Sequence, residues 1–111
     1  RVVDVKRVLE AYSFPPEYNG SFTIKVEDFY APWNSRPFRV FIENGNAKVE
    51  KIEDGPIDVK CDIQTFSQIM FGYLSMREAM ELGKIAACSP ERLDDIATLF
   101  MGHPTYETDS F

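Results

Sequence analysis

Few side chains in this sequence could do chemistry, and they lie far apart along the chain. His103 is the only histidine, so a metal site or an acid–base pair would have to combine it with Glu107 or Asp109 from the same terminal segment. The alternative is an ordinary histidine in a solvated terminal segment. We therefore expect neither a self-sufficient catalytic site nor a metal site within the chain.

The two cysteines, Cys61 and Cys88, are too few for a disulfide framework and lack C-x-x-C spacing. Cys61 falls in an expected strand, and Cys88 precedes an expected helix cap, where a thiol pKa could be lowered. No histidine is placed to activate either thiol. Buried free thiols in a reducing compartment are the favoured interpretation, and one disulfide bond is the alternative.

The six glycines stand singly at expected turns. A phosphate-binding loop needs several glycines close together, so that backbone N–H groups can surround the phosphate. We therefore expect no cofactor site within these residues, and any nucleotide would have to bind elsewhere.

Large apolar side chains raise two further hypotheses. Methionines and phenylalanines of the second half could line a pliable lipid cavity or could simply fill the core. These residues are Phe66, Met70, Phe71, Met76, Met80 and Met101. Trp33, in a loop between expected strands, could anchor an interface or cover the edge of the core. Phe41 is the one apolar residue on the expected wet face of the sheet.

The composition is that of one globular domain with an acidic balance. The chain has 111 residues, of which 44% are apolar, and its net charge is −6. Negative charge disfavours binding to nucleic acids and anionic lipids and suits a cationic partner. No apolar run approaches the roughly 20 residues of a membrane helix, and no export signal is present. We expect a soluble, cytoplasmic protein with no nucleic-acid or membrane partner.

The start of the sequence indicates a larger parent protein. The first residue is Arg1 rather than Met, and an expected helix follows almost at once. We interpret residues 1–111 as a single domain from the C-terminal end of a longer chain.

The first half of the sequence predicts one helix and four strands. Asp4 can cap a helix whose apolar residues recur at helical spacing as far as Tyr12. Apolar and polar side chains then alternate in four segments, as in strands with one wet face. These segments are residues 22–27, 38–43, 47–52 and 57–62. Asn44-Gly45 suits the type I′ turn of a hairpin between the second and third strands.

After Asp62 the apolar spacing changes from two residues to about 3.6. Three helices are expected there, with caps and terminators at Asp62 and Gly72, Ser75 and Gly83, and Ser89 and Gly102. Successive strands followed by helices predict an α+β fold. We expect an antiparallel sheet of four to five strands, covered on one face by helices.

Several short segments, in order along nearly the whole chain, together resemble a known family. They are Arg1-Val2-Val3-Asp4-Val5, Val26-Glu27-Asp28 followed by Pro32-Trp33-Asn34, Phe38-Arg39-Val40, Gly72-Tyr73-Leu74-Ser75 and Asp109-Ser110-Phe111. Their order and spacing resemble the C-terminal domain of the enhanced-intracellular-survival (Eis) type of GNAT N-acetyltransferases. The resemblance implies a sterol-carrier-protein-like fold.

The resemblance also implies a function for the parent protein. Two acetyl-transfer-type domains would precede this one, bind acetyl-coenzyme A and transfer its acetyl group to an amine-bearing small molecule or a lysine side chain. The parent would assemble into a homo-oligomer. The α-carboxylate of Phe111 would reach the acetyltransferase domain as the general base, with Asp109 and Ser110 close to the substrate.

Three hypotheses follow. The chain is an accessory domain of an acetyltransferase, a lipid- or sterol-carrier-like binding domain, or a structural domain that makes oligomer contacts. Uptake of a lipid by the isolated chain would favour the second hypothesis over the first.

Overall fold

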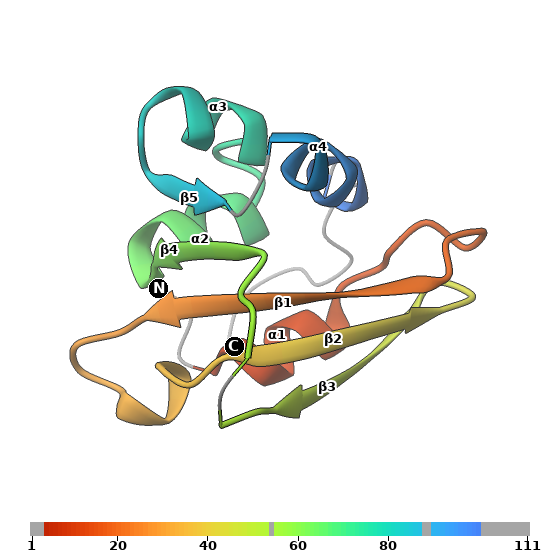
Figure 1. Ribbon diagram of the computed structural model, residues 1–111, viewed down its shortest axis with the longest axis horizontal. Helices are drawn as coiled ribbons and strands as arrows, with labels where there is room; N and C mark the ends of the chain where they lie inside the picture. The colour runs from red at the N-terminus through yellow and green to blue at the C-terminus, as the bar shows by residue number, and fades with distance from the viewer. Residues whose placement is uncertain (1–3, 54, 88–89, 101–111) are drawn as a thin grey trace.

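Five strands form one sheet in the computed structural model, which describes residues 4–53, 55–87 and 90–100. The strands are β1 (Gly20–Glu27), β2 (Phe38–Glu43), β3 (Asn46–Lys51), β4 (Val59–Asp62) and β5 (Ile85–Ala87). Their order across the sheet is β3-β2-β1-β4-β5, with β1 in the centre (Figure 1). The α+β class and the five strands confirm the sequence-based prediction.

The sheet is mixed rather than fully antiparallel, which corrects one part of that prediction. β1 pairs with β2, β2 with β3, and β4 with β5 in antiparallel fashion. β1 and β4 run parallel, with Ile24 opposite Val59 and Val26 opposite Cys61.

The two connections that follow β2 and β3 explain this difference. Asn44 and Gly45 have φ of 53° and 83°, so they form the predicted tight turn between β2 and β3. A Cβ on Gly45 would lie 2.9 Å from the carbonyl oxygen of Phe14, so only glycine fits there. The connection after β3 is longer and carries the chain across the sheet, where Asp58 N–H donates to the Thr23 carbonyl at 3.0 Å. A parallel partner needs such a crossover, and the alternation pattern alone does not reveal it.

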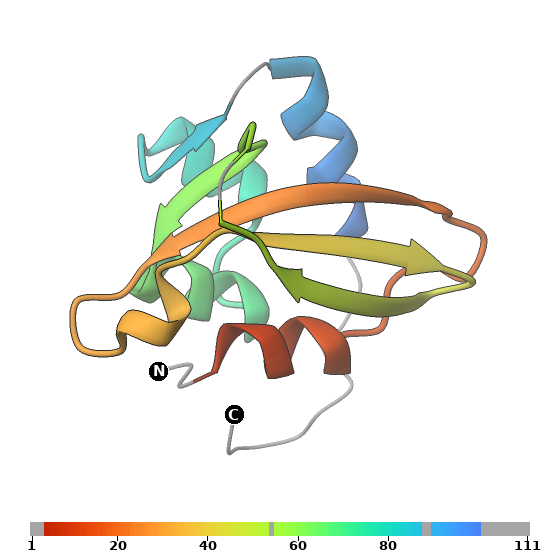
Figure 2. The ribbon, with the colours of Figure 1, turned by 60° about the horizontal axis from the view of Figure 1, so that its bottom comes forward.

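In the described part of the chain, four α-helices and one 3₁₀ helix accompany the sheet. They are α1 (Val5–Ala11), η1 (Pro32–Asn34), α2 (Ile63–Met70), α3 (Met76–Glu81) and α4 (Pro90–Leu99). Figure 2 shows α1 alongside β3 and α4 across the sheet from the viewer. None of the helices in the described part of the chain is long and apolar enough to cross a bilayer.

Local sequence signals determine where these helices begin and end. The Asp4 and Asp62 carboxylates accept hydrogen bonds from the N–H groups of Arg7 and Thr65, at 3.1 and 2.7 Å. Ser75 and Glu78 form the predicted capping box at the start of α3. The expected cap at Ser89 and terminator at Gly102 lie outside the described residues.

The core lies on one face of the sheet, between the strands and the helices. The buried apolar side chains of the strands all project from that face, as the alternation predicts. Rings that follow α1 and α4 in the chain, Tyr12, Phe14 and Phe100, pack with Phe22 of β1 at centroid distances of 5.0 to 5.8 Å. The helices therefore cover one face of the sheet, as predicted.

Candidate functional site

The residues predicted to act in catalysis, Phe111 with Asp109 and Ser110, lie outside the described residues. His103, Glu107, Cys88 and Met101 also lie outside them. The proposed roles of these side chains therefore stay predictions. Among the residues that the structure does describe, no group of three histidine, cysteine, aspartate or glutamate side chains could hold a metal ion.

Cys61 is a buried free thiol, as predicted. Burial, together with the negative charges of Asp62 and Glu27, raises its pKa to about 12. The thiol thus stays protonated near neutral pH, and a protonated thiol is a poor nucleophile. Cys61 is a packing residue of β4.

The methionines of the second half mostly fill the core. Phe66, Met70 and Met76 are all at least 97% buried. A small pocket of about 180 Å³ lies beside Met76 and Phe100, between α3 and α4. Drug-sized ligands occupy pockets of about 300 to 1,000 Å³. This pocket is therefore too small to enclose a long-chain lipid as it stands.

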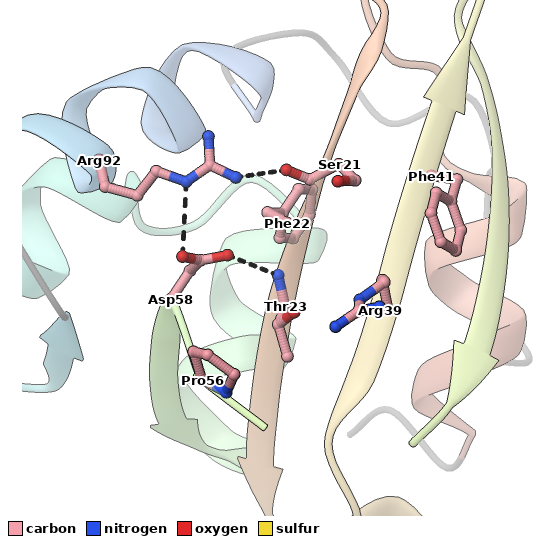
Figure 3. Close-up of a pocket in the computed structure, with 8 residues that line it drawn as sticks. All are labelled: Ser21, Phe22, Thr23, Arg39, Phe41, Pro56, Asp58 and Arg92. Atoms are coloured by element: carbon pink, nitrogen blue, oxygen red, sulfur yellow. Dashed lines mark hydrogen bonds and ion pairs between the residues drawn. The ribbon is translucent and has the colours of Figure 1, made fainter. Parts of the chain in front are cut away.

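A groove of about 280 Å³ lies on the outer face of the sheet, where side chains of α4 and the β3–β4 connection approach β1 and β2 (Figure 3). We call it the outer groove. Its lining residues are Ser21, Phe22, Thr23, Arg39, Phe41, Pro56, Asp58 and Arg92. Phe41 is 39% exposed, which confirms its predicted place on the wet face.

Asp58 and Arg92 close the edge of β1 in this groove. β4 begins opposite Ile24, so the preceding residues of β1 have no strand partner on that side. The Asp58 carboxylate accepts the Thr23 N–H at 2.8 Å, and the Arg92 guanidinium donates to the Ser21 carbonyl. Arg92 Nε also lies 3.4 Å from Asp58 Oδ1. Two side chains thus bind backbone groups that a neighbouring strand would otherwise bind.

The opposite charges of Asp58 and Arg92 are paired with each other within the fold. Desolvation lowers the pKa of Arg92, but the hydrogen bond and charge of Asp58, together with Tyr18, raise it above the ordinary arginine value. Arg92 therefore stays charged, with Asp58 as its counter-ion. Sequence analysis missed this arrangement because Ser21, Asp58 and Arg92 are far apart in the chain, and no local pattern connects them.

A second feature is the segment of residues 28–35, which follows β1 and contains η1. We call it the aromatic loop. Phe29 is 95%, Tyr30 84% and Trp33 51% exposed. The rings of Phe29 and Tyr30 are 6.1 Å apart and nearly edge-to-face. Trp33 is half covered by the domain and half in solvent, so its exposure fits both of its expected roles.

Asp28 organises the backbone of the aromatic loop. Its side chain is 96% buried and accepts hydrogen bonds from the N–H groups of Tyr30 and Ala31, at 3.1 and 3.2 Å. It also accepts one from Asn34 Nδ2 at 2.9 Å. The Asp28 N–H and carbonyl both bond Ser35 Oγ at 3.2 Å. A buried carboxylate is tolerated when it is hydrogen-bonded in this way, and the bonds fix the conformation of the loop.

The loop is also attached to the start of α1. Asn34 is fully buried, and its Oδ1 accepts the Val5 N–H at 3.0 Å. This bond uses one of the N–H groups that a helix leaves free at its N-terminus. The aromatic loop and the first residues of α1 therefore form one structural unit.

Comparison with known proteins identifies relatives of the whole domain. The sequence model of a protein family, the sterol carrier protein domain, matches residues 5–107 of this chain. A GCN5-related N-acetyltransferase from Anabaena variabilis matches with a TM-score of 0.81 and 25% identity, over 94% of this chain and 26% of that protein. Among curated protein sequences, none matches.

Two other solved structures share the fold. Eis1 from Mycobacterium abscessus has 23% identity and a TM-score of 0.75, over 96% of this chain and 26% of its own. Palmitated SCP2L2 from Aedes aegypti has 16% identity and a TM-score of 0.60, over 93% of this chain and 99% of its own. The chain thus spans about a quarter of the Anabaena variabilis protein and of Eis1, and nearly all of the insect protein.

Proposed function

The chain belongs to the sterol carrier protein domain family, and from this premise we propose that it is the C-terminal accessory domain of a GNAT-type, acetyl-CoA-dependent N-acetyltransferase of the Eis type. It supplies contacts to the catalytic domains and a carboxylate to their active site. The proposal places residues 1–111 in a longer, oligomeric, cytoplasmic protein.

The observation that carries this proposal is the match to the Anabaena variabilis protein. It extends over 94% of the chain at a TM-score of 0.81, while covering 26% of that acetyltransferase. The proposal assigns no catalytic role to Cys61, whose thiol stays protonated, or to Asp58 and Arg92, which bind one another and the backbone.

In the proposed reaction the α-carboxylate of Phe111 accepts a proton from the ammonium form of the acceptor, a small molecule or a lysine side chain. The neutral amine nitrogen then attacks the acetyl thioester, a C–N bond forms and the C–S bond breaks. The nitrogen loses a second proton to the departing sulfur, so coenzyme A leaves as the thiol. An α-carboxyl has an ordinary pKa of about 3.3 to 3.7, so it must be partly desolvated in the catalytic cleft to act as a base at neutral pH. Asp109 and Ser110 lie next to the acceptor in this scheme.

Two variants of the longer chain test this role. Deletion of Phe111 shifts the carboxylate and should abolish acetyl transfer, while acetyl-CoA binding persists. The matched control, Phe111→Ala, keeps the carboxylate at the same chain length and should retain most of the turnover. Undiminished turnover after the deletion would contradict the proposal.

Carriage of an apolar ligand is the second candidate function. The pocket beside Met76 and Phe100 has mainly apolar walls and could admit part of an acyl chain if it widened. Native mass spectrometry of the isolated chain with a long-chain fatty acid tests this function. Stoichiometric uptake would favour a carrier, whereas no uptake would leave the accessory role as the better account.

A further inference from the structure

The aromatic loop exposes three large apolar side chains to solvent. Together Phe29, Tyr30 and Trp33 present on the order of 450 Å² of side-chain surface to solvent. The largest apolar patch on a typical monomer has about this size and is often functional. Aromatic side chains are also the residues that most often anchor an interface.

The loop holds these aromatic side chains in one backbone conformation. Asp28 and Asn34, both at least 96% buried, bond the loop internally and to Val5. An interface whose residues are already ordered loses less conformational entropy on binding. This arrangement is therefore suited to docking.

The position of the loop indicates which partner it meets. Because Asn34 bonds the Val5 N–H, the loop lies where the chain enters α1 (Figure 2). A preceding domain that leads directly into α1 would therefore lie close to the aromatic loop, at a high effective concentration.

A membrane surface fits the loop less well. Membrane-binding aromatic segments are usually accompanied by free basic residues that attract anionic lipids. Here the chain carries a net charge of −6, and of three nearby cations, Lys25, Arg36 and Lys60, the last two are paired with glutamates.

We propose that the aromatic loop is the surface on which this domain docks against the acetyltransferase domain that precedes it in the chain. Phe29, Tyr30 and Trp33 enter an apolar surface of that domain, and Asp28 and Asn34 keep the loop aligned with the segment that joins the two domains. This inference rests on the proposed function and adds the docking surface to it.

Hydroxyl-radical footprinting, which reports the solvent accessibility of individual side chains, tests the proposal. The isolated 111-residue chain is compared with the complete longer chain. Phe29, Tyr30 and Trp33 should each be oxidised at least fivefold more slowly in the longer chain. Tyr73 and Leu82, which are 82% and 63% exposed elsewhere on the domain, serve as internal references.

Two results would overturn the proposal. Equal oxidation rates at the three aromatic residues in both chains would show that the loop stays in solvent. Protection that is lost on dilution of the isolated chain would assign the loop to contacts between copies of this domain.

Variants separate this inference from the proposed function. Phe29→Ser/Tyr30→Ser/Trp33→Ser in the longer chain should increase proteolysis between the two domains about tenfold, and the control Tyr73→Ser/Leu82→Ser should leave it unchanged. An active enzyme with an unprotected loop would refute only the docking surface. A protected loop in a chain that transfers no acetyl group would refute the proposed function and the identity of the partner, but not the docking surface itself.

Discussion

Asp28 and Asp58 both bind backbone groups next to β1, the central strand, but with opposite results. Asp58 accepts the Thr23 N–H near the start of β1 and pairs with Arg92, so that the edge of the strand is closed. Asp28 follows the end of β1 and accepts two loop N–H groups, so that Phe29 and Tyr30 are held in solvent. The Asp58 carboxylate thus closes an edge of the sheet, whereas the Asp28 carboxylate fixes the conformation of an exposed loop.

This difference separates a structural site from a binding surface. In the outer groove Asp58 and Arg92 bind one another and the backbone. In the aromatic loop the backbone is equally well bound, yet the largest side chains stay exposed. An interface needs exposed aromatic rings on a backbone whose polar groups are already hydrogen-bonded. The loop is then ordered before the partner binds, so binding costs less conformational entropy.

The largest effect is expected at Asp28. Asp28→Ala leaves the buried Asn34 amide and two loop N–H groups without the carboxylate, which should lower the free energy of unfolding by about 3 kcal/mol. For a domain of this size that corresponds to a fall in Tm of roughly 15 °C. Calorimetry measures it, with Glu27→Ala as the control, since Glu27 makes only an exposed ion pair with Lys60. A loss no larger than that of the control would show that Asp28 does not organise the loop.

Asp58→Ala should have about half that effect. It removes the acceptor of the Thr23 N–H and the counter-ion of Arg92, and we expect a loss of about 1.5 kcal/mol, because the site is only partly buried. Urea denaturation measures this loss. Asp94→Ala, which breaks the exposed Arg77–Asp94 pair, should change stability by less than about 0.5 kcal/mol. Equal losses of stability in the two variants would show that the contacts of Asp58 contribute no more than an ordinary surface ion pair.

Arg92→Lys should cost about 1 kcal/mol. It keeps the positive charge, but an ammonium group cannot reproduce the fork with which Arg92 binds both Asp58 and the Ser21 carbonyl. Hydrogen exchange of the Thr23 amide should become faster as well. Full retention of stability would indicate that only the charge of Arg92 matters.

The smallest effect on the isolated domain is expected for Phe29→Ser/Tyr30→Ser. Both side chains are almost fully exposed, so the free energy of unfolding should change by less than about 0.5 kcal/mol. Chemical denaturation of the 111-residue chain measures this change. A loss of 2 kcal/mol or more would mean that these rings stabilise the domain itself, and it would weaken the case for an interface.

Sequence reasoning succeeded where neighbouring residues decide the structure. The caps at Asp4, Asp62 and Ser75 and the turn at Asn44-Gly45 are contacts within a few residues. Alternation likewise identified the core face of β1, β2 and β4. The class of the fold follows from these local patterns.

The features that sequence reasoning missed depend on residues far apart in the chain. The parallel pairing of β1 with β4 and the closure of the β1 edge join residues 35 to 71 positions apart. β5 has only three residues, Ile85–Ala87, too few to show alternation. Asp28 belongs to one of the segments that carry the family resemblance, but the sequence does not reveal its role. That role depends on hydrogen bonds to Ala31 and Asn34, and on the bond from Val5 to Asn34.

The parallel pairing has a consequence for how the chain folds. The hairpin of β2 and β3 joins neighbouring segments and can form early, whereas β1 gains its second partner only after β4 has been made and has crossed the sheet. The contact between Arg92 and Ser21, which are 71 residues apart, can form only later still. During synthesis one side of β1 therefore stays unpaired until most of the domain has been made. In that interval its backbone N–H and carbonyl groups can associate with other chains.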